Sequence, residues 1–368
     1  MTYRFDEIAI NSTAKKKPVE SDKFHYVGLE HIDSGSFEIT RWGSDVAPVG
    51  EKLIMQKGDV LFGKRRAYQR KVAIAPFDGI FSAHGMVLRP KEDVICKEFF
   101  PFFLSSNQFM DTAIRISVGG LSPTINWKDL QKQEFELPSV EEQRILAEKL
   151  WAAYELKEAY KKMIAATDEM VKSQFIEMFG SGHWEQKCLG EVGTFKRGGG
   201  FQKSDYVECG IPCIHYGQIH TKFGPFIYSH ISEISSDLEC KTKFASKGDL
   251  IIAITSEDTE GSCKSTAWLG DYPVAVGGHA AIFHHSMNPV YMSFFFKSVL
   301  FNHAKMEYIH GTKVCEIKPD DIAKILVPYP PMSLQEEFSS IAQQADKSKF
   351  ELQQAIDKID KVMKSLLQ

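Results

Sequence analysis

Long hydrophobic runs are absent from this chain of 368 residues. No stretch approaches the ~18 apolar residues that a helix needs to cross a bilayer, and the longest runs, such as Phe99–Leu104, are short and interrupted. The N-terminal residues Met1–Asp6 lack the charged and then apolar pattern of a signal peptide. A hydrophobic content of 43% and a charged content of 25% are typical of a soluble globular protein. We therefore expect a cytoplasmic location and no membrane partner.

Cysteine is scarce, and its spacing is irregular. Seven cysteines, an odd number, do not form a disulfide framework. Cys209, Cys213 and His215, with His220 and Cys240 farther along the chain, would make an irregular zinc site, because structural zinc sites usually present two close pairs of ligands. We interpret these thiols as buried and reduced and predict no metal site; a zinc site is the alternative.

Signatures of catalysis are also missing. Asn288–Tyr291 differs by one residue from the Asn/Asp-Pro-Pro-Tyr/Phe motif of amino-methyltransferases, but no glycine-rich cofactor loop accompanies it, so we interpret it as the start of a helix. Gly198–Gly200 lacks the Gly-Lys-Ser/Thr ending of a phosphate-binding P-loop. His84 and His279 have no convincing nucleophile to activate. We predict a non-catalytic chain without catalytic residues.

The chain does contain a long internal repeat. Lys57–Leu61 reappears as Lys247–Ile251, and Ser139–Glu142 lines up with Ser333–Glu336, at offsets of 247 − 57 = 190 and 333 − 139 = 194. Because this period far exceeds the roughly 20–50 residues of solenoid repeats, the repeating unit is a whole domain with its tail. The length also favours two domains. We predict globular domains at 1–138 and 181–332, each followed by a tail, at 139–180 and 333–368.

The two tails have the pattern of long helices. Each begins after proline with Ser-x-x-Glu, the capping box that satisfies free N–H groups at a helix start. Apolar residues then recur at spacings of three and four, and we predict helices at about 139–179 and 333–366, the first about 60 Å long. Such narrow stripes favour antiparallel packing of one helix on the other, with the domains at opposite ends. Separate amphipathic helices, each on its own domain, are the alternative. The predicted partner-binding residues are Leu146, Leu150, Leu156, Phe338, Ile341, Leu352 and Ile356.

The globular halves have the short β-rich runs and few helical segments of α+β domains. Glu98–Phe109 and Val290–Phe301 are predicted to be equivalent aromatic-rich helices. Between the shared landmarks the halves differ, because Gly63–Ile80 contains a strongly basic run whereas Thr255–Asp271 is rich in Ser, Thr and Glu, with Lys264 its one basic residue. A shared frame with replaced polar loops is typical of a recognition module that changed its target after duplication.

The net charge of −4 means that any nucleic-acid binding must use local patches. Closely spaced cations neutralise backbone phosphates and release counterions, although a short basic run is usually a solvated surface loop. Lys196–Lys203 contains three glycines and is predicted to be a flexible cationic loop. The candidate DNA-binding residues are Lys64, Arg65, Arg66, Tyr68, Arg70, Lys71, Arg115, Lys196, Arg197, Lys203 and Lys313.

The duplicated layout, the helix starts at Leu137–Glu142 and Pro330–Glu336, and Leu189–Gly199 resemble the specificity subunit of Type I restriction–modification systems. The resemblance implies two target recognition domains, each reading half of a split double-stranded DNA site, with the helices as an antiparallel coiled-coil spacer. It also implies two methyltransferase subunits docked on the helices, with restriction subunits joined through them. The opening Asn11–Lys17 of the first domain departs from the pattern, because it lacks the glycine-rich loop of the second.

Adenine methylation and ATP-dependent cleavage would then belong to the partners. S-adenosylmethionine, ATP and Mg²⁺ are accordingly expected in the partner subunits, and no cofactor in this chain. Two other readings stay open at this point: a single-chain DNA-modifying enzyme, and a protein-interaction scaffold that uses the helices.

Overall fold

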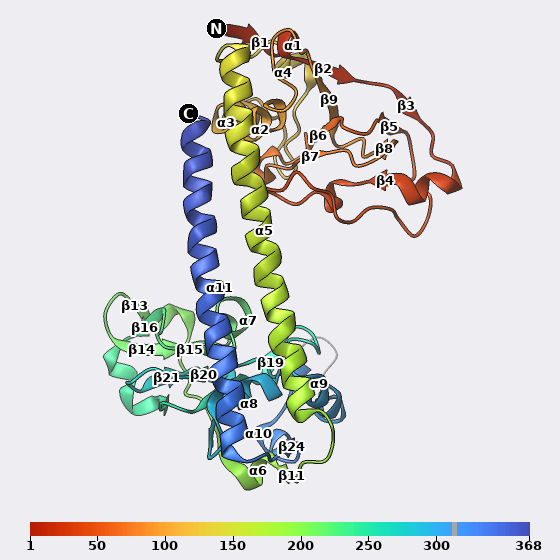
Figure 1. Ribbon diagram of the computed structural model, residues 1–368. Helices are drawn as coiled ribbons and strands as arrows, with labels where there is room; N and C mark the ends of the chain where they lie inside the picture. The colour runs from red at the N-terminus through yellow and green to blue at the C-terminus, as the bar shows by residue number, and fades with distance from the viewer. Residues whose placement is uncertain (311–314) are drawn as a thin grey trace. The chain divides into compact units, whose positions relative to one another are not determined.

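The computed structural model of the protein describes residues 1–310 and 315–368 (Figure 1). It divides into two compact units. Unit 1 comprises Met1–Lys161 with Gln353–Gln368, and unit 2 comprises Lys162–Leu352. None of the described helices is both long and apolar enough to span a membrane.

Two long helices contribute residues to both units: α5, at Val140–Phe179, and α11, at Met332–Leu366. Both were predicted from the three-and-four spacing. α5 ends where expected, because Gly180 follows its last residue and donates its N–H to the Ile176 carbonyl at 2.7 Å. The long helices are therefore fixed by sequence features within their own segments.

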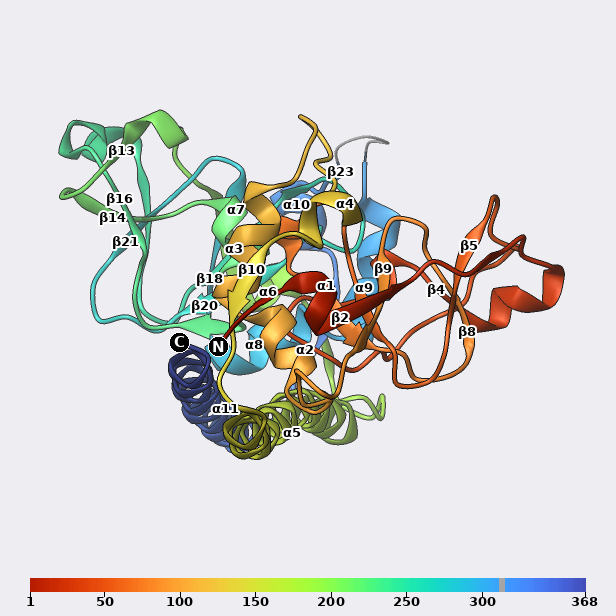
Figure 2. The same cartoon turned by 90° about the horizontal axis from the view of Figure 1, so that it is seen from above.

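Unit 1 is built on two four-stranded sheets, in the strand orders β2-β9-β6-β7 and β3-β5-β8-β4, with a separate pair β1-β10. The strands are β1 (Thr2–Arg4), β2 (Ala9–Ser12), β3 (Lys15–Lys16), β4 (Tyr26–Val27), β5 (Lys52–Met55), β6 (Val60–Phe62), β7 (Val72–Ile74), β8 (Gly79–Phe81), β9 (Met86–Pro90) and β10 (Glu134–Glu136). The other helices are α1 (Phe5–Ile8), α2 (Phe100–Ser105), α3 (Asn107–Arg115) and α4 (Trp127–Leu130), with 3-10 turns η1 (Glu20–His25), η2 (Leu29–His31) and η3 (Ala67–Gln69). In both views the sheet containing β4, β5 and β8 lies farther from α5 than α2 does (Figures 1 and 2).

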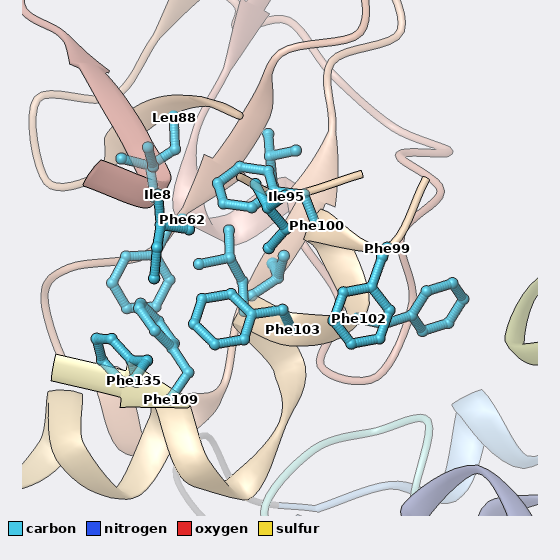
Figure 3. Packing of buried hydrophobic residues seen from close by; sticks show 14 of the residues in the cluster. Ile8, Phe62, Leu88, Ile95, Phe99, Phe100, Phe102, Phe103, Phe109 and Phe135 are labelled. Atoms are coloured by element: carbon cyan, nitrogen blue, oxygen red, sulfur yellow. The ribbon is translucent and has the colours of Figure 1, made fainter. Parts of the chain in front are cut away.

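The core of unit 1 is strongly aromatic (Figure 3). Phe62 on β6 lies 5.4 Å from Phe109 on α3, between ring centroids, and Phe109 lies 5.6 Å from Phe135 on β10. Phe103 on α2 meets Phe135 edge to face at 5.4 Å. Such tilted and edge-on pairs are favourable beyond the area they bury. The cluster ties the end of β6, where the basic run begins, to the helices.

Unit 2 repeats this plan with two five-stranded sheets, β12-β22-β18-β20-β15 and β13-β16-β14-β21-β17, and the pairs β11-β24 and β19-β23. Its strands are β11 (Gln186–Cys188), β12 (Gly193–Arg197), β13 (Tyr206–Val207), β14 (Ile211–Ile214), β15 (Phe226–Ile227), β16 (Ser232–Ile234), β17 (Lys243–Ala245), β18 (Leu250–Ala253), β19 (Thr255–Ser256), β20 (Ser265–Trp268), β21 (Val274–Val276), β22 (Ala280–His285), β23 (Cys315–Glu316) and β24 (Leu326–Pro328). Its other helices are α6 (Leu189–Val192), α7 (Tyr216–Thr221), α8 (Pro289–Phe295), α9 (Val299–Ala304) and α10 (Pro319–Ile322), with 3-10 turns η4 (Lys203–Asp205), η5 (Ser236–Lys241) and η6 (Lys305–Tyr308).

The two aromatic helices predicted at Glu98–Phe109 and Val290–Phe301 are each divided in two, so the prediction of single helices was wrong. Ser106 separates α2 from α3: its hydroxyl donates to the Phe103 carbonyl at 2.7 Å and accepts from the Phe109 N–H at 3.3 Å. Ser298 makes the same bonds in unit 2, at 2.7 and 3.3 Å. A serine that binds nearby backbone groups competes with a continuous helix.

The first predicted capping box is confirmed. The Ser139 N–H donates to Glu142 at 2.8 Å, and the Glu142 N–H donates to the Ser139 hydroxyl at 3.3 Å. The second box is wrong, because α11 begins at Met332 and places Ser333 inside its first turn. Among the described residues no hydrogen bond joins Ser333 to Glu336; instead Pro331 offers its carbonyl to the N–H of residue 334 at 3.1 Å.

The two long helices pack on each other, which confirms the antiparallel prediction. In unit 1, Lys157 near the middle of α5 pairs with Asp360 near the end of α11 at 2.9 Å. In unit 2, Asp168 farther along α5 pairs with Lys349, earlier on α11, at 2.8 Å. A later position on one helix therefore meets an earlier position on the other.

A buried glutamine holds the first turn of each long helix to its own unit. Gln143, which is fully buried, accepts the Cys96 N–H at 2.8 Å and donates to the Pro138 and Val94 carbonyls at 2.9 and 3.1 Å. Gln335 accepts the Asn288 N–H at 2.9 Å and donates to the Pro330 carbonyl at 2.8 Å. Because these bonds satisfy buried backbone groups, each glutamine fixes the angle at which its helix leaves the unit.

The Lys-Gly-Asp repeat forms the same tight turn in both units. Gly58 and Gly248 adopt φ of 90° and 96°, a left-handed conformation that favours glycine. Asp59 accepts the Gln56 N–H at 2.8 Å, and Asp249 accepts the N–H of residue 246 at 2.7 Å. The turn delivers the chain into β6 in unit 1 and into β18 in unit 2.

Candidate nucleic-acid interface

The strand that follows each of these turns leads to the same set of backbone contacts in both units. We call this set of contacts the frame. In unit 1 the Lys64 carbonyl accepts the Ile125 N–H at 3.0 Å, and Arg65 forms a β-bridge with Thr124. In unit 2 the carbonyl of residue 254 accepts the N–H of residue 317 at 3.1 Å, and Thr255 pairs with Glu316. The backbone is therefore the same, and the side chains that it presents are different.

A second chain segment completes the frame in both units. Val118 and Thr124 exchange two backbone hydrogen bonds of 3.0 and 2.9 Å, and so do His310 and Glu316. In unit 1 this segment carries Leu121, which is 97% exposed. An exposed loop held at its base by two backbone bonds suits a surface that contacts a partner.

Positive charge gathers around this frame in unit 1. Burial lowers the pKa of Lys64, and the nearby charge of Lys15 lowers it further. Burial also lowers the pKa of His84, followed by the positive charges of Arg65, Lys64 and Lys52, against a small opposite effect of Glu30. Lys15, Lys52 and His84 were not among the predicted DNA-binding residues. The run Lys15–Lys17 in the sequence indicates Lys15, whereas Lys52 is an isolated lysine that no sequence pattern indicates.

The rest of the predicted basic run is partly engaged in the fold. Arg66 and Arg70 flank η3 at φ of 56° and 51°, a region that costs an ordinary residue about 1 kcal/mol. Arg70 is held by Asn107 at 2.8 Å and Asp111 at 3.2 Å, and Lys71 donates to the Leu29 carbonyl at 2.6 Å. The strained turn leaves Tyr68 54% exposed.

The remaining predicted cations of unit 1 differ in what they contact. Arg66 donates to the Ser122 hydroxyl at 3.2 Å, which links the basic run to the exposed loop. Arg115 is exposed in the last turn of α3. Lys64, Arg65 and Arg66 are thus gathered at the frame, and Tyr68 is exposed on the neighbouring turn η3, whereas Arg70 and Lys71 brace neighbouring segments.

In unit 2 the same frame borders a pocket of about 590 Å³. Thr255 and His279 lie 3.3 Å apart between hydroxyl and Nδ1, and His220 approaches the Thr255 carbonyl at 3.2 Å. The Tyr216 ring lies 5.1 Å from the His279 ring, between centroids. Ser256 and Asp258 also line this pocket. Hydroxyl, imidazole and carboxylate groups, together with one lysine, Lys264, here stand in place of the several cations of unit 1.

The glycine-rich segment of unit 2 is not a flexible loop. The N–H groups of Gly198 and Gly199 donate to the carbonyls of residues 280 and 276 at 2.9 and 2.7 Å. A Cβ on Gly199 would lie 2.7 Å from the Cα of Thr242, so these glycines permit close backbone packing. Arg197 donates to the Gly278 carbonyl at 2.9 Å. Lys196 and Lys203 are exposed, and the predicted Lys313 lies outside the described residues.

The predicted partner-binding residues fall into two groups. Leu150, Phe338 and Ile356 are buried within the chain itself, and Leu146, Ile341 and Leu352 are partly buried. Leu156 is 45% exposed. The apolar stripes are thus largely used for packing inside each unit.

The cysteine and histidine residues considered for zinc do not gather. Cys213 is buried, and burial raises the pKa of its thiol to about 12. Cys209 and Cys240 are exposed. Within residues 1–310 and 315–368, no group of three or more histidine, cysteine, aspartate or glutamate side chains is placed to hold a metal ion.

One protein-family model matches two segments of this chain. The model of the Type I restriction modification DNA specificity domain matches residues 7–165 and 182–361. Among curated proteins, the Type I restriction enzyme EcoDI specificity subunit of Escherichia coli is 24% identical over 163 residues. That match covers 44% of this chain and 36% of the relative, so it spans little more than a third of the relative's length.

Two solved structures share the fold over the full length of the chain. One, from work on complex assembly and conformational transition of the type I R-M system, has a TM-score of 0.59 at 19% identity and is covered over 96% of its length. The other, the S subunit of a Type I restriction–modification system from M. genitalium, has a TM-score of 0.58 at 13% identity and is covered over 94%.

Proposed function

The chain belongs to the Type I restriction–modification DNA specificity family, and we propose that it reads a bipartite site in double-stranded DNA with one recognition surface in each unit. The observation that carries this proposal is the repeated frame. Lys64 and Arg65 in unit 1 occupy the backbone positions of Ile254 and Thr255 in unit 2. Because the backbone is matched while the presented chemistry differs, each unit reads a different half-site.

The two surfaces suit different modes of contact. In unit 1, Lys64, Arg65 and Lys15 attract backbone phosphates, and an arginine also reads guanine through its two acceptors in the major groove. In unit 2, the exposed His279 offers hydrogen bonds to base edges, and the exposed carboxylate of Asp258 accepts from the amino group of cytosine. We therefore propose that unit 2 depends less on salt and more on base identity.

Single substitutions separate the two half-sites. Arg65→Ala in unit 1 and His279→Ala in unit 2 are introduced into the chain in cells that contain its methyltransferase, and methylated bases are mapped genome-wide. Each variant relaxes the sequence of one half-site, with an expected loss of about 1–3 kcal/mol of discrimination where a base is read. An unchanged methylation motif in both variants, or loss of both halves in either one, contradicts the proposal.

The Lys-Gly-Asp turns supply matched controls. Lys57→Ala and Lys247→Ala each remove one lysine from the turn at the opposite end of the strand that leads to the frame. Both variants are expected to keep the motif unchanged. If Arg65 contacts phosphate, its alanine variant instead weakens binding to all sequences and lowers the salt slope by about 1.

We further propose that the exposed parts of α5 and α11 dock two methyltransferase subunits, with restriction subunits joined through them. Leu156 on α5 is 45% exposed, and Met163 is 52% exposed, which supports an apolar contact with a second chain. Adenine methylation, cleavage, S-adenosylmethionine, ATP and Mg²⁺ then belong to those partners.

Co-elution with the methyltransferase subunit tests this docking surface. Leu156→Asp is expected to weaken the complex at least about tenfold, because it places a charge in an apolar contact. Lys161→Asp, which changes charge on the same helix at an exposed position, is the control. If the Leu156→Asp complex stays intact, the methyltransferase subunit does not dock at Leu156.

A further inference from the structure

A second pocket in unit 2, of about 400 Å³, is lined by an excess of positive charge. It lies between α5, α7, the start of β20 and the segment from the end of α8 to η6. Four lysines line it, Lys172, Lys264, Lys297 and Lys305, against the single carboxylate of Glu260, a formal excess of three positive charges. We call this the lysine pocket.

Two of these lysines have no direct ion-pair partner among the described residues. In the described part of the chain, the side chains of Lys264 and Lys297 make no ion pair and no hydrogen bond. Lys305, which is only 2% exposed, donates to the Glu260 and Ser262 carbonyls at 3.2 and 2.8 Å and keeps a third donor. Lys172 pairs with Glu169 on the solvent side of α5 at 2.7 Å. The pocket therefore lacks the negative charge that would balance it.

One residue that lines the lysine pocket, Ser265, has a hydroxyl without a partner in the part of the chain that the structure describes. Ser265 is 2% exposed, and its Oγ is buried with no hydrogen-bond partner among the described residues. A buried hydroxyl without a partner is destabilising, which makes it rare in native structures. A bound oxyanion would accept its proton and remove that cost.

Unit 1 provides an internal comparison for these residues. Ser265 pairs with the third residue of β18, and the corresponding partner in unit 1, opposite the third residue of β6, is Val72. The serine caps Ser106 and Ser298 are equivalent, so the residue before each cap is Ser105 in unit 1 and Lys297 in unit 2. Unit 2 thus differs from its copy by a hydroxyl and a cation in one pocket.

The charges around Lys297 also favour an anion in the lysine pocket. Although its side chain reaches the surface, burial lowers its pKa to about 8, and the charges of Lys349, Lys264 and Lys172 lower it further while Asp168 acts the opposite way. Like charges that depress a lysine in this way make an anion favourable at the same place.

We propose that the lysine pocket binds a phosphate group. Three point charges that converge with a free hydroxyl match the several oxygens and the charge of up to about −2 of a phosphate better than the two oxygens and single charge of a carboxylate. The phosphate comes either from a DNA backbone or from a free phosphate compound. Binding of a phosphate does not require that the two frames read DNA, so this proposal stands apart from the proposed function.

Titration of the full chain with pyrophosphate, followed by calorimetry, tests the site. Saturable binding is expected. Lys297→Ser and Ser265→Val install the residues of unit 1; the first is expected to weaken binding about tenfold and the second about threefold, and Lys264→Ala about tenfold. Lys247→Ala, an exposed lysine paired with Asp271, is the control and should bind as the original chain does.

Two results overturn the proposal. One is the absence of saturable pyrophosphate binding up to about 10 mM, a limit near −3 kcal/mol. The other is equal affinity in the original chain and in Lys264→Ala/Lys297→Ser, with folding of each protein checked by its melting temperature. Because Lys264 and Lys297 are both exposed, at least one of the single variants is expected to fold and to decide the question.

Duplex DNA of about 30 base pairs then distinguishes the two sources. Lys264 also lines the pocket at the frame of unit 2, whereas Lys297 lines the lysine pocket and not that one, so Lys297→Ser is the variant used with duplex DNA. If the phosphate belongs to DNA, Lys297→Ser lowers duplex affinity and reduces the salt slope by about 1. If it is a free compound, Lys297→Ser weakens pyrophosphate binding and keeps its duplex affinity. Either result supports the pocket, and pyrophosphate still decides if no duplex binds.

Discussion

In unit 1 the carboxylate of Asp59 binds Arg89 through two hydrogen bonds of 2.6 and 2.9 Å, whereas in unit 2 the equivalent Asp249 binds His284 at 2.6 Å. Both aspartates brace the same turn, and both partners lie at the same register of the neighbouring strand. The comparison separates two kinds of residue. Side chains that satisfy the backbone of their own unit are kept, and those that meet solvent or a ligand have diverged.

The largest expected effect tests the kept residues. Gln143→Ala and Gln335→Ala each leave buried backbone groups without partners, which costs about 1–3 kcal/mol per group. We expect a loss of about 3 kcal/mol of unfolding free energy in either variant, measured by peptide-resolved hydrogen exchange. Gln353→Ala, at an exposed position of α11, is the control and should change stability by less than about 0.5 kcal/mol. Markedly different losses for the two buried glutamines would show that the units do not use the same anchor.

Acid is expected to weaken unit 2 through His285, whose position is occupied by Pro90 in unit 1. Burial lowers the pKa of His285 from 6.5 to about 4. Between these values the unfolded chain binds more protons, so stability is lost as pH falls. We expect a loss of about 2 kcal/mol at pH 5 relative to pH 7.

His285→Leu isolates this effect, because burial also lowers the pKa of His31 and His84 in unit 1 and of His215 in unit 2. The variant should remove about 2 kcal/mol of the acid sensitivity of unit 2 and leave unit 1 unchanged. Hydrogen exchange at pH 5 and 7 measures both. The same acid sensitivity in variant and original would assign it to other groups.

The two helix-to-helix ion pairs are expected to have a smaller effect. The Lys157 side chain is 9% exposed and that of Lys349 is 22% exposed, while their aspartate partners are about half exposed, at 53% and 48%. Partly exposed pairs contribute about 0.2–1 kcal/mol, and the more buried Lys157–Asp360 pair should lie at the upper end. Double-mutant cycles with Lys→Met and Asp→Asn changes measure each pair. A larger coupling for Lys349–Asp168 would reverse the ranking.

The smallest expected effect concerns the two turns that Asp59 and Asp249 hold. His284→Arg recreates in unit 2 the bidentate pair of unit 1 and should stabilise it by about 0.5–1 kcal/mol. Arg89→His in unit 1 should have the opposite sign. Denaturant unfolding of the two variants at pH 8 gives both values. Equal signs would mean that the surroundings, and not the identity of the partner, set the strength of the brace.

The sequence predicts best the features whose cause lies within a few residues. The helix α5 and its Ser139 capping box follow from local spacing, and the Lys-Gly-Asp repeat locates the turn that precedes each candidate surface. The breaks at Ser106 and Ser298 were missed because a serine in an aromatic segment binds its neighbours as readily as it continues a helix.

The candidate sites were predictable only in part, because their members come from distant segments. The run at residues 64–71 marked the frame of unit 1, yet Lys15 and Lys52 lie on the paired strands β3 and β5 and approach the frame from elsewhere in the chain. Arg70 appeared equivalent to Arg65 in the sequence, but its bonds to Asn107 and Asp111 make it a brace. The lysine pocket had no local signal at all, since its lysines come from α5, the start of β20 and the segment around α9.

The two ion pairs between the long helices have a consequence for how such a chain arises. Lys157 and Lys349 occupy corresponding positions of the two repeats, as do Asp168 and Asp360, at one offset: 349 − 157 = 192 and 360 − 168 = 192. Each repeat therefore contributes one lysine and one aspartate, and these pair with the aspartate and the lysine of the other repeat. This is the reciprocity of an isologous contact. A self-complementary surface needs to evolve only once, and gene duplication then supplies both of its sides.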